Sequence, residues 1–287
     1  MRSQVKLKIA GVPFLVESDF EPVISDNFTR FITQNEPKYK IGIFHGDAFS
    51  CDFEKTIKLS ENTDVVLSEN GIRKFYKLTS SGEVYATSFF EPGTNSAEVR
   101  YFNDSVGFMK HLENSFFCAS AEDILLEESS FFFHACCVDT RHGALLFSGD
   151  SGIGKSTQGR LWEKYQNSSI VSDDRPIVGR KDGVWFAHSS PVSGRFVPSG
   201  NVSDKINSLV FLVQGKANVI ERIDKNTAIK EMIRQSAFAF CEKKQIMKML
   251  DLLDDFCEKV NIYRYKCLPD VSAVEFLDKV LEEQSNE

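Results

Sequence analysis

The sequence predicts a mixed α/β protein with a β-rich N-terminal part, residues 1–124, and an α/β C-terminal part, residues 125–287. Two observations lead to this prediction. Short strand-like segments separated by turn residues fill the first part. In the second part, apolar strands alternate with helical patterns. A length of 287 residues suits one large domain or two modest ones, at roughly 100–200 residues per domain.

The N-terminal part is expected to form an antiparallel β-rich unit. Its first two strands, residues 5–9 and 14–16, flank a turn at Gly11. Further strands are expected at residues 40–44, 65–67, 73–78, 84–90 and 98–102. Residues 106–117 suit a helix, although a Phe pair in this segment also suits a strand. Because no catalytic spacing occurs here, we expect this part to position a substrate or to hold subunits together.

The C-terminal part shows the alternation of an α/β core. Strands are expected at residues 131–138, 143–148, 169–171, 184–186 and 209–213. Helices are expected at residues 155–165, 228–240, 244–258 and 273–283.

Composition excludes several classes of function. The net charge of −7, from 34 basic and 41 acidic residues, argues against a general nucleic-acid binder, which usually carries a basic excess. No apolar run reaches the roughly 18 residues of a membrane span, and the N-terminus lacks the apolar core of a signal peptide. The seven Cys form no CxxC pair, which disfavours a zinc site. Together these features predict a cytoplasmic protein with reduced thiols and no membrane partner.

A phosphate-binding loop is predicted after the strand at residues 143–148. The sequence GDSGIGKST at residues 149–157 fits the pattern GxxxxGK[ST] at every fixed position. Such a loop turns its backbone N–H groups toward phosphate, while the Lys binds the β- and γ-phosphates and the Ser hydroxyl binds Mg²⁺. The alternative, a Gly-rich turn without a ligand, is disfavoured because motif and context agree. The predicted ATP-binding residues are Gly149, Asp150, Ser151, Gly152, Ile153, Gly154, Lys155, Ser156 and Thr157.

A pair of carboxylates follows the next strand. Asp173 and Asp174 come directly after the apolar segment at residues 169–171. An Asp at the end of a buried strand holds Mg²⁺, and a neighbouring Asp accepts a proton from an attacking hydroxyl. The alternative is a surface turn capped by Asp. Proximity to the phosphate loop, with only one helix between them, favours the functional interpretation.

These pieces resemble the catalytic domain of the HPr kinase/phosphorylase family, a group of phosphate-loop kinases related to the ATP-dependent phosphoenolpyruvate carboxykinases. The resemblance rests on His134-Ala135, on residues 149–157, and on the acidic pair with Arg175, in this order and at short intervals. Some members of the family are encoded beside peptide-modification genes, and three segments of this chain are similar to segments of those members. They are the Lys-Ser-Thr order in the loop, residues 191–195 and residues 267–274. The resemblance covers roughly residues 125–285.

The resemblance implies a role for each matching residue. Asp174 corresponds to the general base, and Mg²⁺ is shared among Ser156, Asp173 and Asp174. His134 corresponds to a catalytic His close to the phosphates, the alternative being a neutral core His. Arg195 corresponds to a phosphate contact, the alternative being a solvated loop Arg. The implied activity is an ATP- and Mg²⁺-dependent kinase that phosphorylates a Ser or Thr hydroxyl of a peptide or small protein, and a homo-oligomer is compatible with it.

Two alternatives stay open at this point. A small-molecule kinase or carboxykinase-like enzyme should carry a second basic cluster for carboxylates and a His/Lys pair for Mn²⁺, and neither is evident in the sequence. A non-catalytic nucleotide-binding regulatory module would need Lys155 but not Asp174. Turnover of ATP with and without Asp174 separates these classes.

Overall fold

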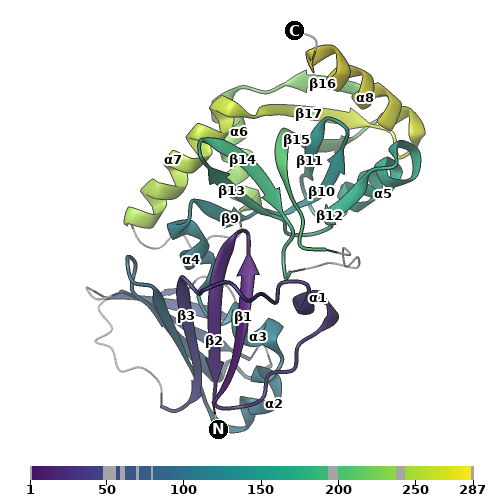
Figure 1. The fold of residues 1–287 in the computed structure, drawn as a ribbon. Coiled ribbons are helices and arrows are strands. Elements are labelled where there is room, and N and C mark those ends of the chain that lie inside the picture. Colours follow the sequence, from purple (N-terminus) through teal and green to yellow (C-terminus); the bar gives the residue numbers. More distant parts are fainter. Residues whose placement is uncertain are drawn as a thin grey trace. The chain divides into compact units, whose positions relative to one another are not determined.

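The computed structural model describes residues 2–47, 56–58, 62–68, 71–78, 80–192, 200–236 and 243–285. It is a mixed α/β protein (Figure 1), as the sequence predicts. The chain divides into two compact units. Unit 1 comprises Met1–Glu128 and Phe238–Lys248, and unit 2 comprises Ser129–Ala237 and Met249–Glu287. That residues 1–124 and 125–287 act as separate domains stays a prediction.

Unit 1 is built on one mixed sheet. Within the described ranges its strands are β1 (Ser3–Ile9), β2 (Val12–Ser18), β3 (Tyr39–His45), β4 (Thr56–Lys58), β5 (Thr63–Ser68), β6 (Gly71–Lys77), β7 (Val84–Phe90) and β8 (Ser96–Tyr101). Their order is β1-β2-β3-β8-β7-β6-β5-β4. The expected all-antiparallel pairing is wrong at the centre, where β2 with β3 and β3 with β8 are parallel. The long connection over residues 19–38 makes the first parallel pairing geometrically accessible.

Short helices complete the core of unit 1. They are α1 (Asp26–Thr29), the 3-10 helix η1 (Asn103–Ser105), α2 (Val106–Met109), α3 (Leu112–Phe117) and α4 (Ala121–Glu127). The Phe116 ring lies edge-on to the rings of Phe14 and Phe28, at centroid distances of 5.7 and 5.8 Å. These contacts attach α1 and α3 to β2.

The helix expected at residues 106–117 is interrupted between α2 and α3. The Val23 N–H donates to the Lys110 carbonyl (2.8 Å), and the Leu112 N–H donates to the Val23 carbonyl (3.0 Å). Pairing with a distant segment therefore takes backbone groups that a continuous helix would use internally.

A buried ion cluster ties β6 to α4 within unit 1. The side chain of Lys74 is fully buried, and its ammonium contacts the carboxylates of Glu122 and Asp123. The Gln245 amide also donates to Asp123 Oδ1 (3.2 Å). Burial by itself would lower the pKa of Lys74, but the two carboxylates raise it above its ordinary value.

Unit 2 contains a second sheet. Its strands are β9 (Ser130–Phe132), β10 (Ala135–Thr140), β11 (Gly143–Ser148), β12 (Ser169–Ser172), β13 (Ile177–Lys181), β14 (Val184–His188), β15 (Ser203–Gln214), β16 (Val219–Arg222) and β17 (Asn261–Cys267). The order is β12-β10-β11-β15-β14-β13-β9, and β17 pairs with both β15 and β16. The long strand β15 pairs with β14 near its start and with β17 near its end.

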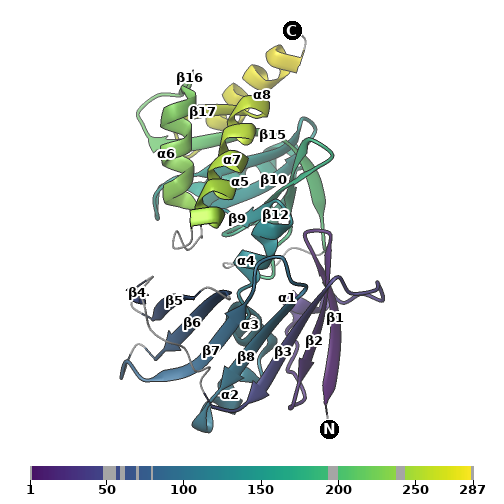
Figure 2. The ribbon, with the colours of Figure 1, turned by 90° about the vertical axis from the view of Figure 1, so that its left-hand side faces the viewer.

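Helices cover both faces of this sheet. They are α5 (Lys155–Gln166), α6 (Lys225–Gln235), α7 (Lys243–Lys259) and α8 (Val271–Ser285). The part of α7 that belongs to unit 2 begins at Met249. Figure 2 shows α6 and α7 in front of one face. There the Trp185 ring meets the Phe256 ring edge-on at 5.1 Å, and its N–H donates to Asp255 (2.9 Å). On the other face, Trp162 of α5 and Leu277 of α8 share one apolar core with the sheet.

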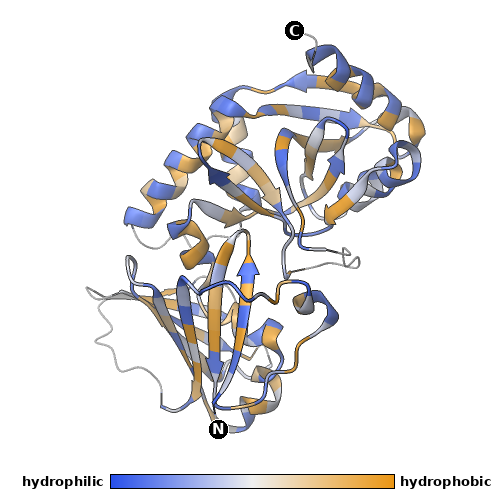
Figure 3. Ribbon diagram, in the orientation of Figure 1, coloured by the Kyte–Doolittle hydropathy of each residue, from blue (hydrophilic) through white to orange (hydrophobic). Residues whose placement is uncertain are grey.

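The burial of these elements follows their apolar periodicity. Polar and apolar residues alternate along many strands, and α7 carries its apolar residues along one side (Figure 3). Over the described ranges, no helix is both long enough and apolar enough to cross a membrane.

Candidate functional site

The predicted functional residues that the structure describes follow strands that end at one edge of the unit 2 sheet. Strand β11 runs parallel to β15, and β15 runs parallel to β17. Because β10 is antiparallel to both β11 and β12, β12 has the same direction as β11. The carboxyl ends of β11, β12, β15 and β17 therefore lie at one edge, where β10 begins. Open α/β sheets bind ligands outside the carboxyl ends of their strands.

The loop between β11 and α5 contains three glycines with positive φ values. Gly149, Gly152 and Gly154 adopt φ values of +134°, +79° and +118°, a region that residues with a Cβ rarely enter. At Gly149 a Cβ would also approach the Leu212 carbonyl oxygen to 3.3 Å. Gly154 immediately precedes α5, whose 12 residues direct the positive end of the helix dipole toward the loop.

Lys155 folds back over this loop. Its side chain is mostly buried, and its ammonium donates to the carbonyls of Gly149 (2.9 Å) and Asp150 (3.1 Å). Burial lowers the pKa of Lys155, and the negative charge of Asp174 partly offsets that effect. Ser156, in the first turn of α5, is exposed. The loop thus presents one cation and one hydroxyl at the helix N-terminus.

Hydrogen bonds from two other elements orient His134. Its backbone N–H donates to the carbonyl of Gln235 (2.8 Å), and its Nδ1 donates to the side-chain oxygen of the same Gln235 (3.0 Å). Burial and the charge of Lys155 lower the pKa of His134. At neutral pH the ring is therefore neutral with its proton on Nδ1. Its Nε2 then presents a lone pair 3.6 Å from Asp174 Oδ1.

The two carboxylates after β12 differ in exposure. Asp173 is buried, whereas about a third (35%) of the Asp174 side chain is exposed, with the Arg175 Nε at 3.5 Å from its Oδ2. Burial, with the charge of Asp173 adding to it, raises the pKa of the Cys136 thiol to about 12. Lys155 acts on the same thiol in the opposite direction. Against the effect of burial, the charge of Asp174 raises the pKa of Lys155, so this carboxylate and the loop lysine lie close to one another.

The oxygen groups suit Mg²⁺ better than a transition metal. In the part of the chain that the structure describes, no cluster of three or more His, Cys, Asp and Glu side chains could hold a metal ion. Mg²⁺ usually keeps several waters and binds one or two carboxylates together with substrate phosphates. The carboxylates of Asp173 and Asp174, with the Ser156 hydroxyl, fit that requirement.

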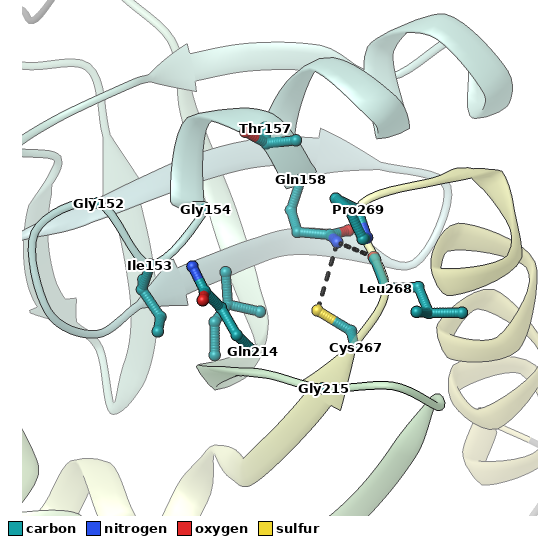
Figure 4. Close-up of a pocket in the computed structure, with 11 residues that line it drawn as sticks. Gly152, Ile153, Gly154, Thr157, Gln158, Gln214, Gly215, Cys267, Leu268 and Pro269 are labelled. Atoms are coloured by element: carbon teal, nitrogen blue, oxygen red, sulfur yellow. Dashed lines mark hydrogen bonds between the residues drawn. The ribbon is translucent and has the colours of Figure 1, made fainter.

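A pocket of about 420 Å³ adjoins the loop on the side of β15 and β17 (Figure 4). The loop contributes Ile153, and α5 contributes Thr157 and Gln158. The ends of β15 and β17 contribute Gln214 and Cys267. The pocket extends the candidate site away from the acidic pair.

Sequence reasoning missed several residues of this site. Gln235 orients His134 from a helix 101 residues away in sequence, and Gln158 and Cys267 line the pocket. A polar residue in a helix, such as Gln158, carries no local signal of such a role. Arg195, a predicted phosphate contact, lies outside the described residues.

Comparisons with known proteins show little similarity. No protein family matches the chain, and no curated protein sequence matches it. Among solved structures, the HPr(Ser) kinase/phosphatase from Coxiella burnetii is similar over 54% of this chain and 95% of that chain, with 12% identity and a TM-score of 0.29. At this TM-score the likeness carries no argument about fold or activity.

Proposed function

We propose that unit 2 is an ATP- and Mg²⁺-dependent phosphate-loop kinase that phosphorylates a Ser or Thr hydroxyl of a peptide or small protein. The observation that supports this is the convergence of a glycine-rich loop, Lys155 and Asp174 at one sheet edge. The kinase core of HPr-kinase type, the peptide acceptor and the cytoplasmic location rest on the sequence resemblance and composition. Unit 1 would position the acceptor or hold subunits of a homo-oligomer together.

Nucleotide binding follows from the groups around the loop. The N–H groups of residues 149–157 and the Lys155 ammonium bind the phosphate oxygens. Asp173, Asp174 and Ser156 would hold Mg²⁺. When bound, the metal ion neutralises charge on the phosphates. Arg195 is proposed as a further phosphate contact.

Phosphoryl transfer needs a group that takes the proton of the acceptor hydroxyl. His134 Nε2 and Asp174 Oδ1 lie 3.6 Å apart, an arrangement that suits a hydroxyl donor placed between them. The hydroxyl proton passes to Asp174, and the hydroxyl oxygen forms a bond to the γ-phosphorus. The bond from that phosphorus to the bridging oxygen breaks, and ADP leaves with the electron pair. His134 contacts the acceptor through Nε2, and Gln235 keeps that nitrogen unprotonated.

The substitution Asp174→Asn tests the chemistry. The amide keeps the shape of the side chain but takes no proton, so phosphoryl transfer should fall about 10²–10⁴-fold while ATP binding changes less. The assay supplies [γ-³²P]ATP with a cell extract or a peptide encoded nearby, and measures acid-stable, alkali-labile label. Asp182→Asn is the matched control because Asp182 is exposed in the turn between β13 and β14.

The other possible outcomes of this assay lead to different conclusions. Transfer at the wild-type rate by the Asp174→Asn variant would refute the assignment of the base. Label found only on a free metabolite would indicate a small-molecule kinase. ATP binding without transfer to any acceptor would indicate a regulatory module.

A further inference from the structure

The pocket beside the loop lies on the opposite side of β11 from the acidic pair. In the sheet, β10 and β12 lie on one side of β11, and β15 and β17 lie on the other. Asp173 and Asp174 follow β12, whereas the pocket is formed at the ends of β15 and β17. A triphosphate bound along the loop with its γ-phosphate toward Asp174 therefore directs its nucleoside toward this pocket.

The walls of the pocket suit a flat aromatic group. Ile153, Leu212, Leu268 and Pro269 contribute apolar surface. The volume of about 420 Å³ is within the usual range of small-molecule sites, roughly 300–1,000 Å³. Such a volume accommodates a purine base together with part of its ribose.

The rim of the pocket is held in place by hydrogen bonds. The Gly215 N–H donates to the Cys267 carbonyl (3.3 Å). The Leu268 N–H donates to the side-chain oxygen of Asn218 (2.9 Å), and the Leu268 carbonyl accepts from Gln158 Nε2 (3.2 Å). These bonds fix the positions of Gly215, Leu268 and Gln158 at the rim.

One buried acceptor at the pocket lacks a donor. Gln158 is 2% exposed, and its Nε2 points to Leu268 and Cys267 (Figure 4). Its Oε1 is buried and has no hydrogen-bond partner among the described residues. Leaving a buried acceptor without a hydrogen bond is unfavourable. A ligand that brings a donor to Oε1 would remove this penalty.

We propose that this pocket binds the adenine base of ATP and that Gln158 Oε1 accepts a hydrogen bond from the adenine 6-amino group. The proposal rests on the proposed phosphate-loop function. It also predicts base selectivity. Guanine carries a carbonyl oxygen at the same position, so two acceptors would face each other and the penalty at Gln158 would stay.

The test compares three ligands by calorimetry on the full chain: MgATP, MgGTP and magnesium tripolyphosphate, which has no base. We expect MgATP to bind at least tenfold more tightly than MgGTP. Leu268→Trp, which fills the pocket, should weaken MgATP binding at least tenfold and leave tripolyphosphate binding unchanged. Val219→Trp is the control, because Val219 is an exposed residue of β16 that does not line the pocket.

A second variant isolates the hydrogen bond. Gln158→Met keeps the length of the side chain and should reduce the preference for MgATP over MgGTP to less than threefold. Equal affinities of the wild-type protein for the two nucleotides would overturn the role of Gln158. Unchanged MgATP affinity in a folded Leu268→Trp variant would overturn the pocket while leaving the kinase proposal standing. Absence of binding of both MgATP and tripolyphosphate to the wild-type protein would instead refute the phosphate loop.

Discussion

Replacing Lys74 by Met should strongly destabilise unit 1. The substitution keeps the length and apolar stem of the side chain but removes its charge. Asp123, with 1% of its side chain exposed, then loses the ammonium that it contacts, and Glu122 remains beside it. Breaking a buried ion pair at one partner costs about 3–5 kcal/mol. This is a large fraction of a typical unfolding free energy of about 5–15 kcal/mol.

Urea denaturation, monitored by far-UV circular dichroism, measures how much Lys74→Met lowers the free energy of unfolding. The two tryptophans, Trp162 and Trp185, belong to unit 2, so their fluorescence follows that unit separately. Lys6→Met is the control, because Lys6 pairs with the 92% exposed side chain of Glu36 and such surface pairs contribute roughly 0–1 kcal/mol.

The pH dependence of the Lys74→Met variant provides a second readout. Without the ammonium, burial raises the pKa of Asp123 above its unfolded value, so the folded state binds a proton more readily. The deficit relative to the wild type should therefore shrink as the pH falls from 7 toward 5. The reasoning would be refuted if Lys74→Met lowered the free energy of unfolding by less than 1 kcal/mol at pH 7. It would also be refuted if the difference from the wild type grew on acidification.

Two further predictions concern unit 2. Lys155→Ala should reduce ATP affinity or turnover at least tenfold, about 1.4 kcal/mol, because it removes the cation from the loop; the same change at exposed Lys164 of α5 should have little effect. Burial lowers the pKa of His188 from 6.5 to about 4. Below pH 6.5 the unfolded chain therefore binds a proton that the folded chain does not, and the protein loses stability as the pH falls. Between pH 7 and 5, the free energy of unfolding measured by urea denaturation should fall by roughly 2 kcal/mol more for the wild type than for His188→Leu. The variant His111→Leu should show the same pH dependence as the wild type.

The sequence located the strand, loop and helix around Lys155 because their signals are local. Gly149, Gly152 and Gly154 adopt backbone conformations that favour glycine, so the loop geometry is encoded in consecutive residues. The acidic pair was placed for a similar reason, since Asp173 directly follows an apolar strand. These assignments required no knowledge of distant contacts.

The parts that the sequence did not predict depend on distant contacts. Strand β17 was missed because Asn261–Cys267 mixes basic and aromatic residues, and its buried Tyr263 and Tyr265 become interior only through pairing with β15. The roles of Gln158 and Gln235 depend on partners 110 and 101 residues away. Contacts between residues so far apart in the sequence produce no periodic pattern from which they could be predicted.

The division of the chain into units has a consequence for how the protein is made. Unit 1 takes its last segment, Phe238–Lys248, from within the sequence of unit 2. Gln245, which donates to Asp123, is synthesised 122 residues after it. Most of unit 2 is therefore synthesised before Gln245 can donate its hydrogen bond to Asp123 in the buried cluster at Lys74. We infer that the N-terminal unit completes its folding late in translation, and that a cut after Glu128 yields a C-terminal fragment that still carries a piece of the other unit.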